Sequence, residues 1–283
     1  MTCTAIQNEL SALRARRREQ AQIVATMPHN AGYEAAVDTL EQIDADIAET
    51  QAELDHCLAQ EEQAQNPVPQ NILGTVTQIE CHAASKEVGK DEPYLLVAAF
   101  DLTNVINLGI IGVNLPGVNV VKIGPWSGVV PGGVYNASLL SAQNRPPFWN
   151  LSGQGSPIAN AQGVIFLVAC MEHDGSSPDN IRGVVRDNLL AARINNTNLA
   201  YGGYVTNMIS NMTGAIETGR LVPGKPSLNF DDLFDDVKQL TLTAGDLADL
   251  NALNPVTKTL RFTQRKAGGT AINDYTVTFS FTV

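Results

Sequence analysis

The hydrophobic pattern of the chain changes near residue 64. From Thr4 to about Gln63, apolar residues recur at spacings of three and four, and glycine or proline occurs only near residues 28–32. This spacing is typical of amphipathic helices that pack as a coiled coil. The sequence therefore predicts two helices that fold back on each other near residue 30, forming an antiparallel helical hairpin over residues 1–64.

A dense basic cluster lies in the first of these helices, at residues 14–18. A fold-back near residue 30 brings Arg14 opposite Asp46 and Arg16 opposite Asp44, and it also brings the apolar stripes of the two helices together. Opposite charges in such positions stabilise a helix pair. The cluster is therefore predicted to be neutralised inside the hairpin, and no nucleic acid is needed to explain it.

The four cysteines, at positions 3, 57, 81 and 170, include no C-x-x-C pair, which argues against a zinc site. The fold-back sets Cys3 opposite Cys57 at the open end of the hairpin. In an oxidising compartment these two residues would form a disulfide, and in a reducing one they would be two free thiols. The sequence leaves both alternatives open.

Beyond a proline-containing linker at residues 65–71, the pattern becomes alternating and β-branched. Strands separated by Gly, Pro and Asn clusters favour an antiparallel sandwich over residues 72–283. The predicted strands are 73–83, 93–101, 118–124, 163–171, 237–243, 257–264 and 274–283. The expected fold class is α+β.

A two-helix insertion at residues 177–221 is predicted between the fourth and fifth of these strands. Ser177 and Pro178 resemble a helix start, and two helices follow at 179–194 and about 201–219. Met208, Met212 and Ile216 lie on one side of the second helix. This stripe either packs on the sandwich or contacts a membrane.

Acidic residues follow or precede three of the predicted strands. Asp91 and Glu92 come before one strand, Glu172 and Asp174 come after another, and Asp231 and Asp232 precede a third. Calcium takes six to eight oxygen ligands, which loops gathered at one end of a sandwich can supply. The alternative is an acidic loop end that is solvated or internally salt-bridged.

The sequence motifs at these positions resemble those of the C-two domain, a calcium- and lipid-binding sandwich. They are GKDEPYLLV at 89–97, EHD at 172–174 and DD at 231–232. The resemblance implies a C-two-like sandwich with calcium ligands at Glu92, Glu172, Asp174, Asp231 and Asp232. It also implies an anionic membrane as a partner. Lys86 stands where the family usually has an aspartate. The whole chain is also similar to uncharacterised bacterial proteins, which implies no function.

Composition narrows the function further. The 29 acidic and 18 basic residues give a net charge of −11, which argues against nucleic acid as a partner. The four histidines are scattered, and no hydrolase, metalloprotease or phosphate-loop motif occurs, so we expect no enzyme. No apolar run suits a transmembrane helix, and the N-terminus lacks a conventional signal-peptide pattern. We expect a chain that is cytoplasmic or exported without such a signal.

The sequence therefore predicts a non-enzymatic binding or assembly protein. Its hairpin would associate with itself or with a protein partner. Its sandwich would bind calcium, and the insertion or the hairpin would dock on a membrane or a protein partner. A secreted effector or pore-forming protein is one alternative, and a structural subunit of a filament or shell is another.

Overall fold

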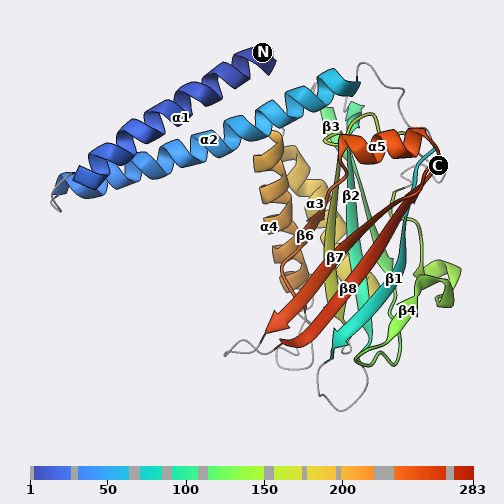
Figure 1. Ribbon diagram of the computed structural model, residues 1–283. Coiled ribbons are helices and arrows are strands. Elements are labelled where there is room, and N and C mark those ends of the chain that lie inside the picture. The colour runs from blue at the N-terminus through green and yellow to red at the C-terminus, as the bar shows by residue number, and fades with distance from the viewer. Residues whose placement is uncertain are drawn as a thin grey trace. The chain divides into compact units, whose positions relative to one another are not determined.

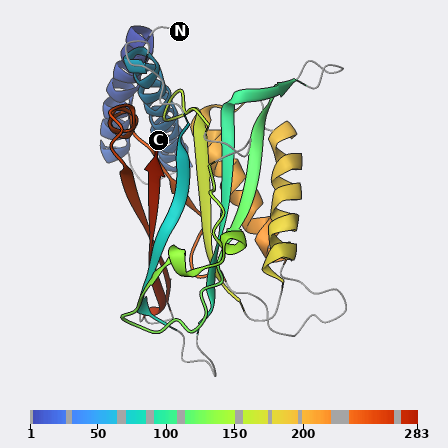
Figure 2. The ribbon, with the colours of Figure 1, turned by 90° about the vertical axis from the view of Figure 1, so that its right-hand side faces the viewer.

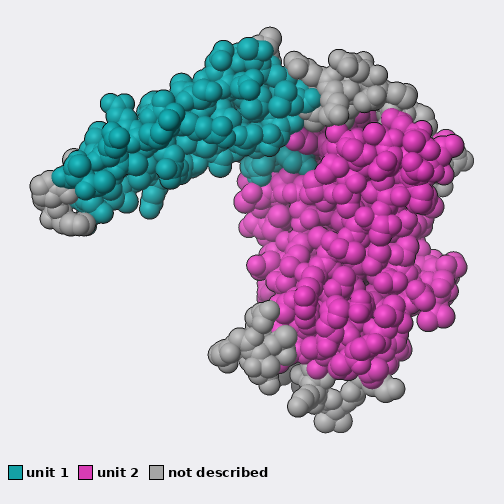
Figure 3. Space-filling model, viewed as in Figure 1, with its two compact units in different colours: residues 1–65, 198–204 teal, residues 66–197, 205–283 magenta. Residues whose placement is uncertain are grey.

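The computed structural model describes residues 3–26, 31–63, 71–84, 91–107, 114–149, 156–173, 177–195, 199–219, 233–265 and 271–283. It confirms the predicted α+β layout of two N-terminal helices followed by antiparallel sheets with further helices inserted (Figure 1). The chain divides into two compact units, residues 1–65 with 198–204 and residues 66–197 with 205–283 (Figure 3). The predicted linker at 65–71 lies outside the described residues except for Asn71.

The hairpin consists of α1 (Cys3–Thr26) and α2 (Ala31–Gln63), which pack side by side. Its seam follows steps of three and four through Ile6, Leu10 and Leu13, all buried, because these spacings keep one stripe facing the partner helix. Cys3 and Cys57 form a disulfide with their Cα atoms 5.4 Å apart. Of the two alternatives, the structure has the disulfide.

The same stepping places polar residues at the seam beyond Leu13. Arg17 forms an ion pair with Asp44, and Gln20 Nε2 donates to the Ala36 carbonyl at 3.0 Å. The predicted partners of the basic cluster were therefore wrong. Asp44 pairs with Arg17 rather than Arg16, since position 17 continues the seam, whereas Arg14 Nη2 donates to Gln51 Oε1 at 2.9 Å. A polar seam position fixes helix register at some cost in stability.

Two four-stranded sheets form the second unit, and each predicted strand is present within a few residues. The first sheet has the order β4-β1-β8-β7, and its strands are β1 (Leu73–Ala83), β4 (Val134–Asn136), β7 (Val256–Arg265) and β8 (Ala271–Thr282). The second has the order β3-β2-β5-β6, and its strands are β2 (Pro93–Asn107), β3 (Asn114–Ile123), β5 (Val164–Glu172) and β6 (Lys238–Leu240). All pairings are antiparallel.

An aromatic core fills the space between the sheets. The ring of Phe148 makes edge contacts with Phe166, Phe279 and Phe281, at centroid distances of 5.4, 5.9 and 5.5 Å. Trp149 is fully buried beside Phe166. The two aromatic residues at 148 and 149 come from a loop, so a connecting segment supplies the centre of the core and joins both sheets through it.

Two helices cover the outer face of the second sheet, α3 (Pro178–Asn195) and α4 (Tyr201–Gly219) (Figures 1 and 2). Strands β2 and β5 are consequently buried on both faces, with Leu96 and Leu167 on the helix side fully covered. Met208, Met212 and Ile216 of α4 are buried as well. The apolar stripe of the insertion therefore packs internally, which is the first of its two alternatives.

Short elements in the loops were not predicted. They are β4, the single-turn helices η1 (Ala137–Leu139) and η2 (Ala142–Asn144), and helix α5 (Ala244–Asn251). Helix α5 begins with a capping box, in which the Thr243 side chain accepts from the Asp246 N–H and Asp246 accepts from the Thr243 N–H. The three-residue elements carry too little periodicity for a pattern to detect, and the eight residues of α5 make only about two helical turns.

Candidate functional site

Two of the five predicted calcium ligands lie within the described residues. Glu92 precedes β2 and Glu172 ends β5, and the two strands pair there with Pro93 opposite Glu172. The His173 N–H donates to the Glu92 carbonyl at 3.2 Å. Both glutamates thus belong to one end of the second sheet. Asp174, Asp231 and Asp232, together with Lys86, lie outside the described residues.

Strand alternation separates the side chains of the two glutamates. Leu95 and Cys170 form a cross-strand pair in the core, so Pro93 and Glu172 continue the row on the core side of the sheet. Glu92 and His173 belong to the opposite face. Glu92 Oε2 lies 3.2 Å from His173 Nδ1, and Glu172 is only 5% exposed. The two carboxylates therefore leave the sheet in opposite directions.

The neighbouring Asp91 is committed to a buried hydrogen bond. The Tyr275 hydroxyl of β8 donates to Asp91 Oδ2 at 2.6 Å, and Phe234 stacks on the tyrosine ring at 4.8 Å. Burial, and then the hydrogen bond to Asp91, raise the pKa of Tyr275 well above its usual value. Burial likewise raises the pKa of the nearby Cys81 thiol to about 11. Both groups keep their protons at neutral pH, and the tyrosine hydroxyl connects β8 of the first sheet to Asp91.

These contacts decide how well the described residues fit a calcium ion. Calcium prefers six to eight oxygen ligands around one point. Asp91 accepts a hydrogen bond from Tyr275, and Glu92 lies against His173. Glu172 lies on the face of the second sheet opposite to that of Glu92. Within the ranges that the structure describes, no three acidic, histidine or cysteine side chains are grouped to hold a metal. The five-residue calcium site stays a prediction that depends on Asp174, Asp231 and Asp232.

Removing the buried tyrosine hydroxyl tests the importance of this bond. We expect Tyr275→Phe to lower the free energy of unfolding by about 1.5–3 kcal/mol, because the Asp91 carboxylate loses a donor in a site without free access to water. Tyr135→Phe is the matched control, since the Tyr135 hydroxyl also accepts a hydrogen bond, from the Val130 N–H at 2.9 Å, but at a half-buried position without a carboxylate partner. Urea unfolding followed by tryptophan fluorescence measures both. Equal losses in the two variants would contradict the assignment.

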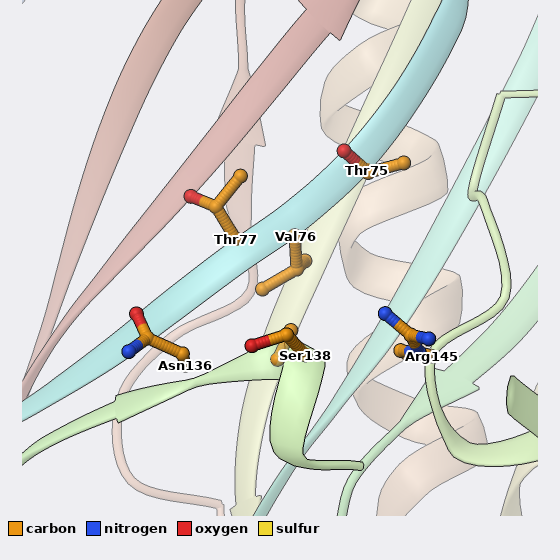
Figure 4. A pocket seen from close by; sticks show the side chains of 7 residues that line it. Thr75, Val76, Thr77, Asn136, Ser138 and Arg145 are labelled. Atoms are coloured by element: carbon orange, nitrogen blue, oxygen red, sulfur yellow. The ribbon is translucent and has the colours of Figure 1, made fainter. Parts of the chain in front are cut away.

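A second candidate site is a hollow of about 340 Å³ at the edge of the first sheet. It lies where β4 separates from β1, and most of the residues around it have polar side chains, although their apolar atoms contribute as much of its surface as their polar atoms (Figure 4). The lining residues are Thr75, Val76, Thr77, Asn136, Ala137, Ser138 and Arg145. Sequence reasoning missed this site because its residues come from three short segments that share no motif.

The membrane prediction has no direct support in the geometry. The apolar stripe of α4 is buried, and none of the described helices combines the length and apolarity that crossing a bilayer requires. Docking on a membrane surface therefore stays a prediction.

Comparisons with known proteins leave the chain without an assigned family. No protein-family model matches it, and no curated protein does. A solved structure described as "CC2D1B coordinates ESRCT-III activity during the mitotic reformation of the nuclear envelope" has a TM-score of 0.24 and 7% identity, over 99% of this chain and 89% of that one. At this TM-score the similarity carries no argument, and the C-two resemblance remains one of sequence motifs.

Proposed function

We propose that this chain is a non-enzymatic binding and assembly protein, and that its hairpin associates with the hairpin of a second copy. The observation that supports this is the separation of charge between the two helices. Helix α2 contains no lysine or arginine, whereas the arginines of the hairpin are clustered in α1. Each hairpin thus has one acidic and one basic helix.

Among the described side chains of the hairpin, most of these charges have no ion-pair partner within it. Arg17 pairs with Asp44, and the Arg18 Nε–H donates to the Arg14 carbonyl at 3.3 Å. Among the described residues, Arg16 and Arg18 have no ion pair with a carboxylate. Where the exposure of α2 side chains is described, the exposed carboxylates other than Asp44 are Glu34, Asp38, Glu41, Glu49, Glu53 and Asp55. Solvent-facing charges of both signs therefore remain available to a partner.

Two such hairpins are complementary when a two-fold axis relates them. The basic stretch of α1 in the first copy then faces the acidic α2 of the second. The two-fold axis makes the α2 of the first copy face the α1 of the second in the same way, as a symmetric dimer requires. A helix of 24 residues is about 36 Å long, enough for several such pairs. Electrostatic complementarity of this kind selects the partner and sets the register.

Charge-removing variants of the full chain test the proposal. We expect sedimentation velocity to show a monomer–dimer equilibrium that weakens at high ionic strength, because exposed ion pairs are screened by salt. Arg16→Gln with Arg18→Gln should weaken association about tenfold, since the two-fold axis doubles the loss to four ion pairs of a few tenths of a kcal/mol each.

The matched control is Arg182→Gln with Arg186→Gln on α3, which removes the same charge from pairs made within that helix. These substitutions should leave the equilibrium unchanged. A monomer under all conditions would refute the proposal, and so would a dimer that is insensitive to salt. Open-ended polymers would instead support the alternative of a filament subunit.

A further inference from the structure

The hollow beside β1 exists because the edge of the first sheet is covered by two separate segments. Residues 78–80 pair with β4, whereas Gly74 accepts from the Phe148 N–H at 2.9 Å and Ile72 pairs with Ser156. A register shift between Val76 and Gln78 leaves Thr77 as an inserted residue in β1. A bulge of this kind bends its strand, and bulges are common near binding sites. Residues 75–77 thus form the wall of the hollow between the two covering segments.

The lining supplies hydrogen-bonding groups and one charge. Ser138 contributes a hydroxyl, Asn136 contributes an amide, and Arg145 contributes a guanidinium (Figure 4). The hydroxyls of Thr75 and Thr77 already donate to the Ser280 and Thr278 carbonyls of β8, so the donors left for a ligand are those of Ser138, Asn136 and Arg145. The chain has no Asp, Glu, Lys or Arg between Lys122 and Arg145. Among the described residues, no carboxylate forms an ion pair with Arg145. In a chain of net charge −11, this cation is left available next to a polar cavity.

We propose that this hollow binds a small molecule or a chain end that carries a single carboxylate. A guanidinium presents a planar fork of donors that matches the two oxygens of a carboxylate. One positive charge balances one negative charge, whereas a doubly charged phosphate would leave excess negative charge in the site. Ligand pockets begin at about 300 Å³, so the hollow suits a compact ligand of this kind.

Titrations of the full chain with matched probes test this site. The probes are N-acetyl-dialanine with a free carboxylate, the same peptide with a C-terminal amide, lactate, and inorganic phosphate. Backbone amide shifts of Val76 and Ala137 in two-dimensional NMR give a local readout. We expect the free peptide, lactate or both to move these signals, and the amide to move neither. Their relative affinities then identify a chain end or a small organic acid as the ligand source.

Variants of the arginine complete the test. Arg145→Gln should weaken carboxylate binding roughly 10- to 100-fold, because a hydrogen-bonded charge is lost. The affinity of Arg145→Lys should lie between those of the wild type and Arg145→Gln. Arg186→Gln removes an equal charge from α3 and should have no effect. Arg145 is exposed, so the variants should fold. The proposal is overturned if neither carboxylate binds, if the amide or phosphate binds as well as the carboxylates, or if Arg145→Gln binds like the wild type.

Discussion

Reduction of the Cys3–Cys57 disulfide is expected to lower the free energy of unfolding of the hairpin by about 4 kcal/mol, because the bond closes a loop with a sequence separation of 54 residues. The disulfide restricts the unfolded chain, which without it could separate its ends freely. Beyond Leu13 the α1 side of the seam is polar, and the buried apolar residues there are Ala36 and Ile43 of α2, so this part offsets only some of the loss. The hairpin should therefore melt roughly 15–30 °C lower when reduced.

Two spectroscopic signals separate this effect from changes in the sandwich. Circular dichroism follows the helices of both units, because α3, most of α4 and α5 belong to the second one, whereas Trp126 and Trp149 report on the second unit alone. Helix loss without a change in tryptophan fluorescence is therefore the unfolding of the hairpin. Reductant should lower the temperature at which the hairpin helices unfold, and it should leave the transition seen by tryptophan fluorescence unchanged. Cys3→Ser with Cys57→Ser should reproduce the reduced state and no longer respond to reductant. Identical helix melting before and after reduction would show that the disulfide does not stabilise the hairpin.

Truncation of Phe148 is expected to have an effect of similar size on the sandwich. The side chain is fully buried and contacts aromatic rings from both sheets, so Phe148→Ala should cost about 3–5 kcal/mol through lost burial and the cavity left behind. The Phe148 ring also restricts which residue can stand at position 74. A Cβ added at Gly74 would lie 2.7 Å from the Phe148 ring, so only glycine fits there.

Urea unfolding monitored by tryptophan fluorescence measures this cost. Leu139→Ala is the control, because Leu139 is also in the loop region but is 76% exposed, and we expect its effect to stay within about 0.5 kcal/mol. A loss at Phe148 no larger than at Leu139 would mean that the loop is not anchored in the core by this ring.

Much of the fold could be predicted because burial is periodic. The steps through Ile6, Leu10 and Leu13 predicted the hairpin, and the alternation of Thr with apolar residues predicted β7 and β8. Loop residues have no such period. Phe148 gave no sign that it would enter the core, and β4 was too short to detect. The predicted partner of Asp44 was wrong by one residue. A fold-back point known only approximately fixes which parts of the two helices face each other, but it does not fix which single residues do.

The candidate sites were harder to predict, because they depend on which face a residue occupies. Glu92 and Glu172 look equivalent in the sequence, yet their faces follow from the pairing of Pro93 with Glu172, which only the structure provides. The partner of Tyr275 could have been sought, since a buried tyrosine hydroxyl needs a hydrogen bond. Nothing in the sequence points to Asp91 as that partner, because the two residues are far apart along the chain.

The disulfide also ties the beginning of the described chain to a point near the end of α2. If a protease cuts the chain between α1 and α2, the peptide bond is lost but the two fragments stay covalently joined. Such a nicked chain keeps its full mass until a reductant is present. Cleavage under oxidising conditions would thus leave α1 attached, and reduction of the disulfide would remove its covalent link.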